Sequence, residues 1–394
     1  MSKPIILIFS AGYLPGYKAG GPIRSISNLV AVLGNELQFK IITADRDLGE
    51  STPYSGVKLD EWQQIGSASV FYASPSSLKL MNLRKIINSV EYDVSYINSF
   101  FSTNFAIKPL LLRCLKLIPQ TPTILAPRGE FSPGALALKR FKKSWYISLA
   151  RLCRYYENIT WQASSAFEEL DIQNVFQNVK ISISVPIVVA PDLPNVIESK
   201  LYCSPNKVTG ELDIVFLSRI SPKKNLEGAL TLLEGLQGKI RFNIYGPAED
   251  KVYFEKCMKV AVKLKPAVEV VYQGEVPHNK VKEIFSNHHL FLFPTHGENY
   301  GHVILESLVA GCPVLLSDQT PWTKLCEAGV GWEFPLHMKE EFRKALQQCL
   351  DMDNSTFHIM SQQSADYGRK KSIDPLVIEQ NLMMFKSVLK VPLI

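Results

Sequence analysis

Short apolar runs alternate with segments of helical periodicity along most of this chain, and this alternation limits the folds that it can adopt. Runs of Val, Ile and Leu without polar alternation are typical of strands covered on both faces, and intervening helices favour parallel sheets. The pattern therefore predicts an α/β protein. Strands are expected at Pro4–Ser10, Phe39–Ala44, Ser69–Ala73, Val94–Asn98, Thr121–Ala126, Ile159–Ala163, within Ile181–Val189, and at Asp213–Ser218, Arg241–Tyr245, Val268–Tyr272, Leu290–Pro294, Pro313–Ser317 and Gly331–Phe334.

The alternation of strands and helices is interrupted at Pro191–Asn195, because two prolines there break regular structure and a polar stretch follows. We place a domain boundary there, which divides the 394 residues into domains 1–190 and 191–394. Each part has the size of one doubly wound domain. The last helix, at about 376–391, is expected to pack back on the N-terminal domain. Two such domains would face a central cleft, because ligands of open parallel sheets bind at the carboxyl ends of the strands.

Composition indicates which kinds of site and which cellular compartment are compatible with the sequence. Residues 1–200 hold 21 Lys/Arg and 15 Asp/Glu, so the whole net charge of +6 lies in this half, whereas all seven histidines lie at or after His278. The seven cysteines are scattered and form no C-x-x-C pair, which argues against a structural zinc site and is typical of a reducing compartment. The sequence has no apolar run long enough for a spanning helix. We expect a cytoplasmic protein.

A glycine pair follows the first predicted strand. Gly20 and Gly21 precede Pro22, which suits the first position of a helix. Glycines let the backbone approach a ligand, and the free N–H groups at a helix start favour an anion. The alternative interpretation is a plain strand-to-helix turn.

A basic turn follows the first strand of the second domain. Arg219 and Lys224 are five residues apart across a turn that contains proline, so both side chains can reach a ligand at the carboxyl end of the strand. Two cations there would stabilise a departing diphosphate. A solvated basic turn is the alternative.

The third motif places two glutamates around a helix start. Glu298 lies in a loop and Glu306 within the helix that begins near His302. The amides of Asn299, Tyr300 and Gly301 would lie at the helix N-terminus, where a phosphate binds well. One carboxylate could accept hydrogen bonds from sugar hydroxyls and the other from a ribose. The alternative is a capping glutamate followed by one exposed on its helix.

These motifs, in this order, resemble the retaining family 4 glycosyltransferases of the GT-B fold, in which two Rossmann-like domains face a central cleft. The spacing from Glu298 to Glu306 is similar to the E-x7-E signature of that family. The resemblance implies that Glu298 binds the donor sugar, that Glu306 holds the ribose, and that Arg219 and Lys224 stabilise the leaving diphosphate. It also implies further donor contacts and a metal-independent reaction without a cofactor beyond the nucleotide sugar. The further donor residues are Gly20, Gly21, Asn299, Tyr300, Gly301 and His302, with Gly274 and Val276 along the nucleobase.

One segment departs from the family pattern. Many members carry a histidine in an N-domain loop, whereas this chain has Arg128 and Glu130 in the corresponding stretch. We expect these two residues on the acceptor side. The surrounding run, residues 127–136, resembles a subgroup that works on bacterial surface polysaccharides.

Two aspartate pairs could suggest a metal site. Asp45 and Asp47 form one pair, and Asp351 and Asp353 the other. Both are predicted to lie in loops away from the three motifs, so we expect solvated pairs and no metal.

A basic region at residues 113–154 combines nine Lys/Arg and one acidic residue with interleaved Leu, Phe and Trp. Such a region can attach to an anionic membrane leaflet, and the alternative is a helix with a basic solvent face. Nucleic acid is not an expected partner, because no binding motif occurs.

The expected function is transfer of a hexose-type sugar from a UDP-sugar to a lipid-linked oligosaccharide of a capsule, O-antigen or exopolysaccharide, at the cytosolic face of the inner membrane. Two alternatives are a nucleotide-sugar epimerase of the same fold and a non-enzyme that only binds a nucleotide sugar.

Overall fold

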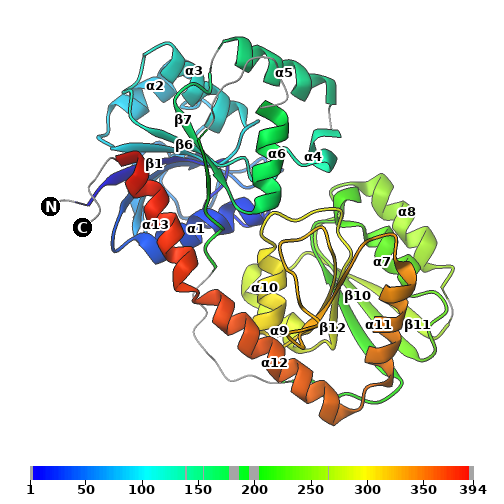
Figure 1. Cartoon of the computed structure of the whole chain (residues 1–394). Helices are drawn as coiled ribbons and strands as arrows, with labels where there is room; N and C mark the ends of the chain where they lie inside the picture. The colour runs from blue at the N-terminus through cyan, green and yellow to red at the C-terminus, as the bar shows by residue number, and fades with distance from the viewer. Residues whose placement is uncertain are drawn as a thin grey trace. The chain divides into compact units, whose positions relative to one another are not determined.

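The structure is a computed structural model that describes residues 3–137, 140–153, 155–176, 186–194, 204–264 and 266–389. The chain divides into two compact units (Figure 1). Unit 1 comprises Met1–Val196 and Asp374–Ile394, and unit 2 comprises Ile197–Ile373.

Unit 1 is built on a sheet with the strand order β3-β4-β2-β1-β5-β6-β7-β8. Neighbouring strands are parallel, except that β3 runs antiparallel to β4. The strands are β1 (Ile5–Phe9), β2 (Gln38–Ala44), β3 (Trp62–Ile65), β4 (Ala68–Ala73), β5 (Val94–Ile97), β6 (Thr123–Leu125), β7 (Ile159–Ala163) and β8 (Ile187–Val189).

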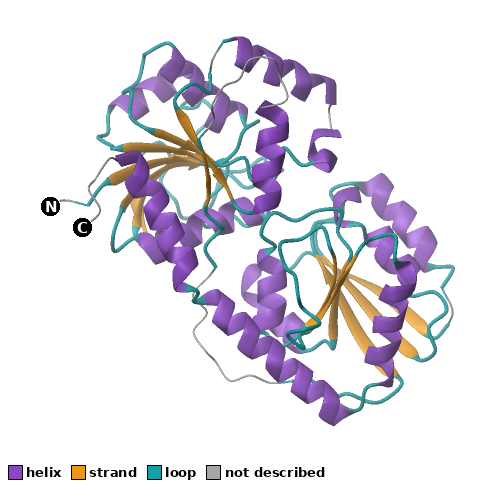
Figure 2. Cartoon of the chain, in the orientation of Figure 1, coloured by secondary structure: helices purple, strands orange, loops and turns teal. Residues whose placement is uncertain are grey.

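Helices cover both faces of this sheet (Figure 2). In the central strand, Ile6 and Ile8 join one buried cluster while Leu7 and Phe9 join another. A strand that is buried on both faces needs an uninterrupted apolar sequence, which is the pattern at residues 5–9. The helices of unit 1 are α1 (Gly21–Leu33), α2 (Leu80–Asn88), the π-helical turn η1 (Thr103–Ile107), α3 (Lys108–Cys114), α4 (Pro133–Ala137), α5 (Arg140–Leu152), α6 (Ala166–Phe176) and α13 (Pro375–Leu389).

The last helix, α13, therefore belongs to unit 1 although it follows unit 2 in the sequence. Met384 and Phe385 are buried in the same cluster as Ile6 and Ile8. The ring of Phe385 lies 5.8 Å from that of Tyr96 on β5.

Unit 2 contains a parallel sheet with the order β11-β10-β9-β12-β13-β14. Its central strand β12 is fully buried. The strands are β9 (Glu211–Leu217), β10 (Lys239–Tyr245), β11 (Val268–Gly274), β12 (Leu290–Phe293), β13 (Val314–Ser317) and β14 (Gly331–Phe334). The helices are the 3₁₀ turn η2 (Pro222–Lys224), α7 (Leu226–Leu232), α8 (Lys251–Ala261), α9 (His278–Ser286), α10 (His302–Val309), α11 (Lys339–Asp351) and α12 (Asn354–Ser372).

The predicted strands are confirmed within the described residues, and the predicted α/β class is correct. The expectation within Ile181–Val189 is confirmed only for β8, because residues 181–185 lie outside the described part. One strand was missed. The segment Trp62–Ile65 carries two glutamines and only pairs along one edge of the sheet, so it lacks the apolar run of a central strand.

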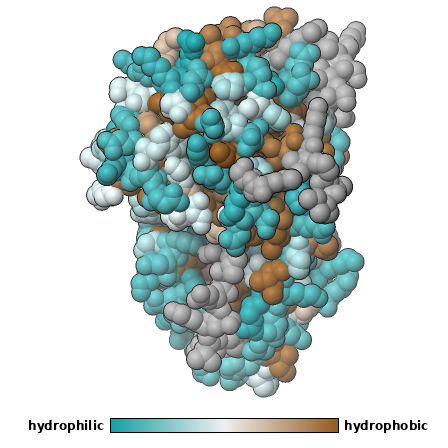
Figure 3. All heavy atoms as spheres, turned by 90° about the vertical axis from the view of Figure 1, so that its left-hand side faces the viewer, coloured by the Kyte–Doolittle hydropathy of each residue, from teal (hydrophilic) through white to brown (hydrophobic). Residues whose placement is uncertain are grey.

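The surface shown in Figure 3 mixes hydrophilic side chains with smaller hydrophobic areas. Every helix among the described residues is too short or too polar to cross a bilayer.

Candidate active site

The candidate site in unit 2 lies where two neighbouring strands end. Strands β9 and β12 pair in parallel, so their carboxyl ends lie at the same edge of the sheet. The turn after β9 carries Arg219 and Lys224, and the loop after β12 carries Glu298. Residues that are 74 positions apart in the sequence thereby meet.

Three hydrogen bonds hold these two connections together. The side-chain amide of Asn225 donates to the carbonyl of Pro294 at 2.8 Å. The carbonyl of Lys223 accepts from the hydroxyl of Thr295 at 3.0 Å and from the backbone N–H of His296 at 2.8 Å. Because these three bonds join the two loops, the side chains that the loops carry are fixed relative to each other.

Lys224 and Glu298 form an ion pair whose side chains are only 15% and 13% exposed. The Lys224 ammonium also lies 5.5 Å from the ring centre of Phe293. Burial, reinforced by the positive charges of Lys223 and Arg219, lowers the pKa of Lys224 well below its usual value. An anion that binds beside Lys224 would act against this lowering of the pKa, because a nearby negative charge favours the ammonium form.

Arg219 lies at the rim of this group and is 44% exposed, with its guanidinium 3.7 Å from the Glu249 carboxylate. Its charge reaches Lys224, as the lowered pKa of that lysine indicates. The weak, exposed contact with Glu249 leaves Arg219 able to turn towards a ligand.

The start of α10 completes this edge. Gly301 caps the helix in a left-handed conformation with φ of 79°. A Cβ atom there would lie 2.7 Å from Cδ1 of Ile304. The indole N–H of Trp322 donates to the carbonyl of Tyr300 at 2.6 Å, which fixes the loop that precedes the helix. The side-chain N–H₂ group of Asn299 is buried without an acceptor among the described residues.

Glu306 lies one turn into α10 with its side chain 15% exposed. Its carboxylate is 3.9 Å from Nδ1 of His278, the first residue of α9. The segment before α9 contains Gly274, which ends β11, and the half-buried Val276. The structure therefore brings the predicted nucleobase segment and the predicted ribose carboxylate together. His278 was not among the predicted residues, because a single histidine at a helix start carries no motif.

In unit 1, Gly20 and Gly21 begin α1. Gly20 caps the helix with φ of 66°, and Pro22 occupies its first turn. A Cβ atom at either glycine would meet nothing within 4 Å, so the backbone faces open space here. This geometry allows a ligand to approach the helix N-terminus closely.

Arg128 and Glu130, which were expected on the acceptor side, both make contacts within unit 1. Arg128 forms an ion pair with Asp192, and its side chain is 7% exposed. The Glu130 carboxylate accepts the backbone N–H groups of Phe100 and Phe101 at 2.6 and 3.0 Å. Burial raises the pKa of Glu130, against these hydrogen bonds, which lower it.

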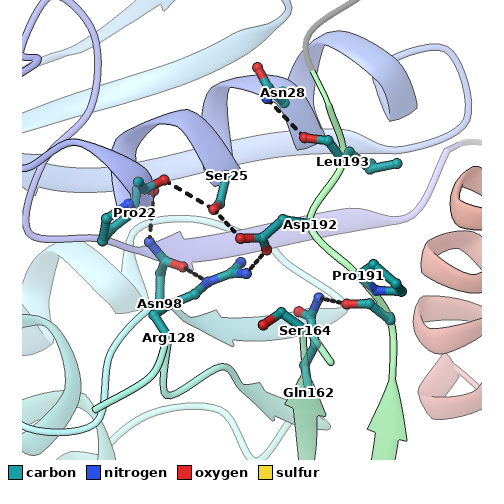
Figure 4. Close-up of polar contacts among 12 residues, drawn as sticks. Pro22, Ser25, Asn28, Asn98, Arg128, Gln162, Ser164, Pro191, Asp192 and Leu193 are labelled. Atoms are coloured by element: carbon teal, nitrogen blue, oxygen red, sulfur yellow. Dashed lines mark hydrogen bonds and ion pairs between the residues drawn. The ribbon is translucent and has the colours of Figure 1, made fainter. Parts of the chain in front are cut away.

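The contacts of Arg128 instead support the start of α1 (Figure 4). Arg128 donates to the side-chain oxygen of Asn98 at 2.6 Å, and Asn98 donates to the carbonyl of Pro22 at 3.1 Å. The hydroxyl of Ser25 donates to Asp192 at 2.7 Å. Arg128 thus positions the helix that carries the glycine pair. The sequence showed an arginine in place of a histidine, but not the distant Asp192 that pairs with it.

The expectation of solvated aspartates is wrong for the first pair. Asp45 and Asp47 are buried, at 3% and 9% exposure. Asp45 pairs with Arg46, and Asp47 accepts the N–H groups of Tyr17 and Lys18. Asp351 and Asp353 are exposed, and Asp353 caps α12. No group of three or more metal-ligating side chains gathers among the described residues.

Two α/β units with parallel sheets define the class of protein, and comparison with solved structures identifies the fold as GT-B. The chain is similar to Anabaena Alr3699/HepE in complex with UDP and glucose, with 13% identity, a TM-score of 0.67, and 99% and 100% of the two chains covered. It is also similar to the apo form of the lipopolysaccharide outer core galactosyltransferase WaaB, with 14% identity, a TM-score of 0.60, and coverage of 98% and 100%.

The second unit can be identified further. Residues 203–371 match the model of the family described as "Glycosyl transferases group 1". A curated relative is the "Uncharacterized 41.2 kDa protein in cps region" of Klebsiella pneumoniae, which is 24% identical over 292 residues and covers 74% of this chain and 76% of its own. These findings support a glycosyltransferase.

Proposed function

We propose that the protein is a retaining glycosyltransferase of family 4 that moves a hexose-type sugar from a nucleotide-diphosphate sugar to a glycan acceptor. The buried pair of Lys224 and Glu298 beside the N-terminus of α10 carries this proposal. A buried cation next to a helix N-terminus suits a diphosphate, and a carboxylate next to it suits sugar hydroxyls.

In the proposed reaction, the donor diphosphate binds between Lys224, Arg219 and the amides of Tyr300, Gly301 and His302. Glu298 gives up its ion pair with Lys224 and accepts hydrogen bonds from hydroxyl groups of the sugar, while Glu306 accepts hydrogen bonds from the ribose. Gly274 and Val276 line the nucleobase, and Gly20 and Gly21 are proposed as further donor contacts.

Chemistry then follows on one face of the sugar. The bond between the anomeric carbon and the phosphate oxygen breaks, and the acceptor oxygen bonds to the same face. The acceptor proton passes to the departing phosphate oxygen. Lys224 and Arg219 stabilise the charge that develops on the diphosphate, which is the main source of rate enhancement in such a step. No metal or separate cofactor takes part in this scheme.

The nucleotide and the acceptor are proposed by analogy with the similar proteins described above. UDP is the proposed nucleotide, because a solved structure of the same fold holds UDP and glucose. A lipid-linked oligosaccharide of a surface polysaccharide is the proposed acceptor, because a relative comes from a cps region and another neighbour is a lipopolysaccharide galactosyltransferase. The reaction would take place at the cytosolic face of the inner membrane.

The first test is thermal-shift screening against UDP-, GDP-, ADP- and TDP-sugars. A ligand that binds only the native state raises the melting temperature, so the UDP-sugars should give the largest shift. Donor alone should be hydrolysed slowly and should yield no epimer. Accumulation of an epimer would favour an epimerase, and binding without any turnover would favour a non-enzyme.

The second test uses Lys224→Ala and Glu298→Ala. Each should lower transfer by about a hundredfold or more without unfolding the protein, because an electrostatic contact to the reacting group is lost. Lys344→Ala and Glu341→Ala provide the control, since they break an exposed ion pair on α11. Near-normal turnover in both site variants would refute the assignment.

A further inference from the structure

Helix α5 presents an apolar stripe to the solvent. Phe141, Trp145 and Leu152 are 91%, 69% and 81% exposed. Their spacing of four and seven residues, with Ser148 between Trp145 and Leu152, places them on one face of the helix. Large apolar side chains gathered in this way on one exposed face are unusual for a surface that faces only water.

The opposite side of α5 already has a partner within unit 1. Ile147 and Ala150 are buried, and the ring of Tyr146 packs edge-on against Phe100 at 5.5 Å. The helix lies at the periphery of its unit (Figure 1). The stripe is therefore a second apolar face on a helix that is already docked.

Basic side chains border the stripe. Arg140 and Lys142 are exposed, and helical geometry places them on either side of Phe141. The sequence has no Asp or Glu between residues 131 and 153. An apolar strip between cations, without acidic residues, is complementary to apolar chains beneath anionic groups.

The turn after α3 extends this surface. Leu115 is 54% exposed and Lys116 is also exposed. The preceding residue, Cys114, has its sulfur 3.8 Å from the carbonyl of Cys153, just after α5 ends. A further apolar residue and a further basic one thus lie near the C-terminal end of the stripe.

Some residues of the predicted basic region, 113–154, make contacts within unit 1 instead of facing the solvent. Arg128 is buried in its ion pair with Asp192. Lys143 donates to the carbonyl of Ala135 and lies 4.8 Å from the ring centre of Phe101. Lys139 and Arg154 lie outside the described residues. The attachment surface is consequently much smaller than residues 113–154.

We propose that α5 lies in the surface of an anionic lipid bilayer, with Phe141, Trp145 and Leu152 inserted between the lipids and Arg140 and Lys142 at their phosphate groups. This deepens the proposed function by giving the enzyme a defined lipid partner. A second copy of the chain fits the stripe less well, because lysine is depleted in protein interfaces and one short stripe offers little of the area that a stable dimer buries.

The test follows Trp145 with lipid vesicles. All five tryptophans are described, and Trp161, Trp322 and Trp332 are buried while Trp62 is half-buried, so Trp145 dominates any change in exposure. Vesicles of phosphatidylglycerol and phosphatidylethanolamine should shift its emission to the blue, and brominated lipids should quench it. Phosphatidylcholine vesicles should have little effect.

Two variants separate the contributions. F141S/L152S should weaken partitioning by about a hundredfold through lost apolar insertion, and R140Q/K142Q by about thirtyfold at low salt. V252S/V262S is the matched control, because these side chains are 79% and 86% exposed but belong to unit 2. Binding of the control should equal that of the wild type.

The proposal is overturned if the wild type gives no blue shift with anionic vesicles, or if the control loses as much binding as F141S/L152S. It is also overturned if the stripe variants only abolish self-association in sedimentation experiments. Vesicle binding requires no donor, and transfer to a dispersed acceptor requires no vesicle, so failure of either proposal can be recognised separately.

Discussion

The proposed function requires a positive charge on Lys224, although this side chain is largely buried. Burial and the charges of Lys223 and Arg219 lower its pKa in the free protein. Below that pKa the ammonium is charged and attracts a diphosphate, and above it the amine is neutral. UDP affinity should therefore fall as the pH rises through the lowered pKa, before an ordinary lysine with a pKa of about 10.4 would lose its proton.

This pH dependence is measured by calorimetric titration of UDP over a series of pH values. Lys224→Arg should flatten the curve, because a guanidinium stays charged throughout. Lys344→Arg, at an exposed position, should keep the wild-type curve. A wild-type affinity that is constant up to alkaline pH would contradict the role given to Lys224.

Individual residues were predictable where a motif fixes them to the end of a strand. Lys224 and Glu298 were both predicted to follow the carboxyl ends of strands, whereas the ion pair between them appears only in the structure. Arg128 could not be assigned in the same way. Its partner Asp192 is 64 residues further along the chain, after two more strands, and no local sequence pattern predicts a buried ion pair.

At the scale of elements, the start of α10 depends on Gly301. Gly301→Ala should strain the left-handed backbone and push the new methyl group towards Ile304. We expect a loss of more than about 1 kcal/mol in the free energy of unfolding, together with weaker UDP binding, because the helix amides are displaced. Urea unfolding and calorimetry measure the two effects.

Gly235→Ala separates strain from site geometry. Gly235 also has a positive φ, of 85°, but a Cβ atom there meets nothing within 4 Å. This variant should lose about 1 kcal/mol of stability while its UDP affinity stays unchanged. Equal UDP affinities in the two glycine variants would argue against a role for the α10 N-terminus.

Strands were predictable where burial on both faces requires an uninterrupted apolar sequence. The fully buried strand β12 reads Leu-Phe-Leu-Phe, whereas edge strand β3 reads Trp-Gln-Gln-Ile and escaped prediction. Helix α5 shows a further limit. Its apolar residues occur on both faces, and only the structure separates buried Ile147 from exposed Phe141 and Trp145.

At the scale of the whole molecule, α13 contributes a central part of the core of unit 1. Phe385→Ala should reduce the free energy of unfolding by about 3–5 kcal/mol, because it removes a fully buried aromatic ring. Leu376→Ala on the same helix should have little effect, since Leu376 is 65% exposed. Urea unfolding followed by fluorescence compares them, and equal losses would contradict the packing described here.

The discontinuity of unit 1 has a consequence for synthesis. The ribosome produces the first 196 residues and then all of unit 2 before it reaches the segment that starts at Asp374. The later-made unit can therefore complete its fold while the earlier one still exposes the apolar groove that Phe385 will occupy. The core cluster that holds Phe385 can therefore be completed only after the whole of unit 2 has been synthesised.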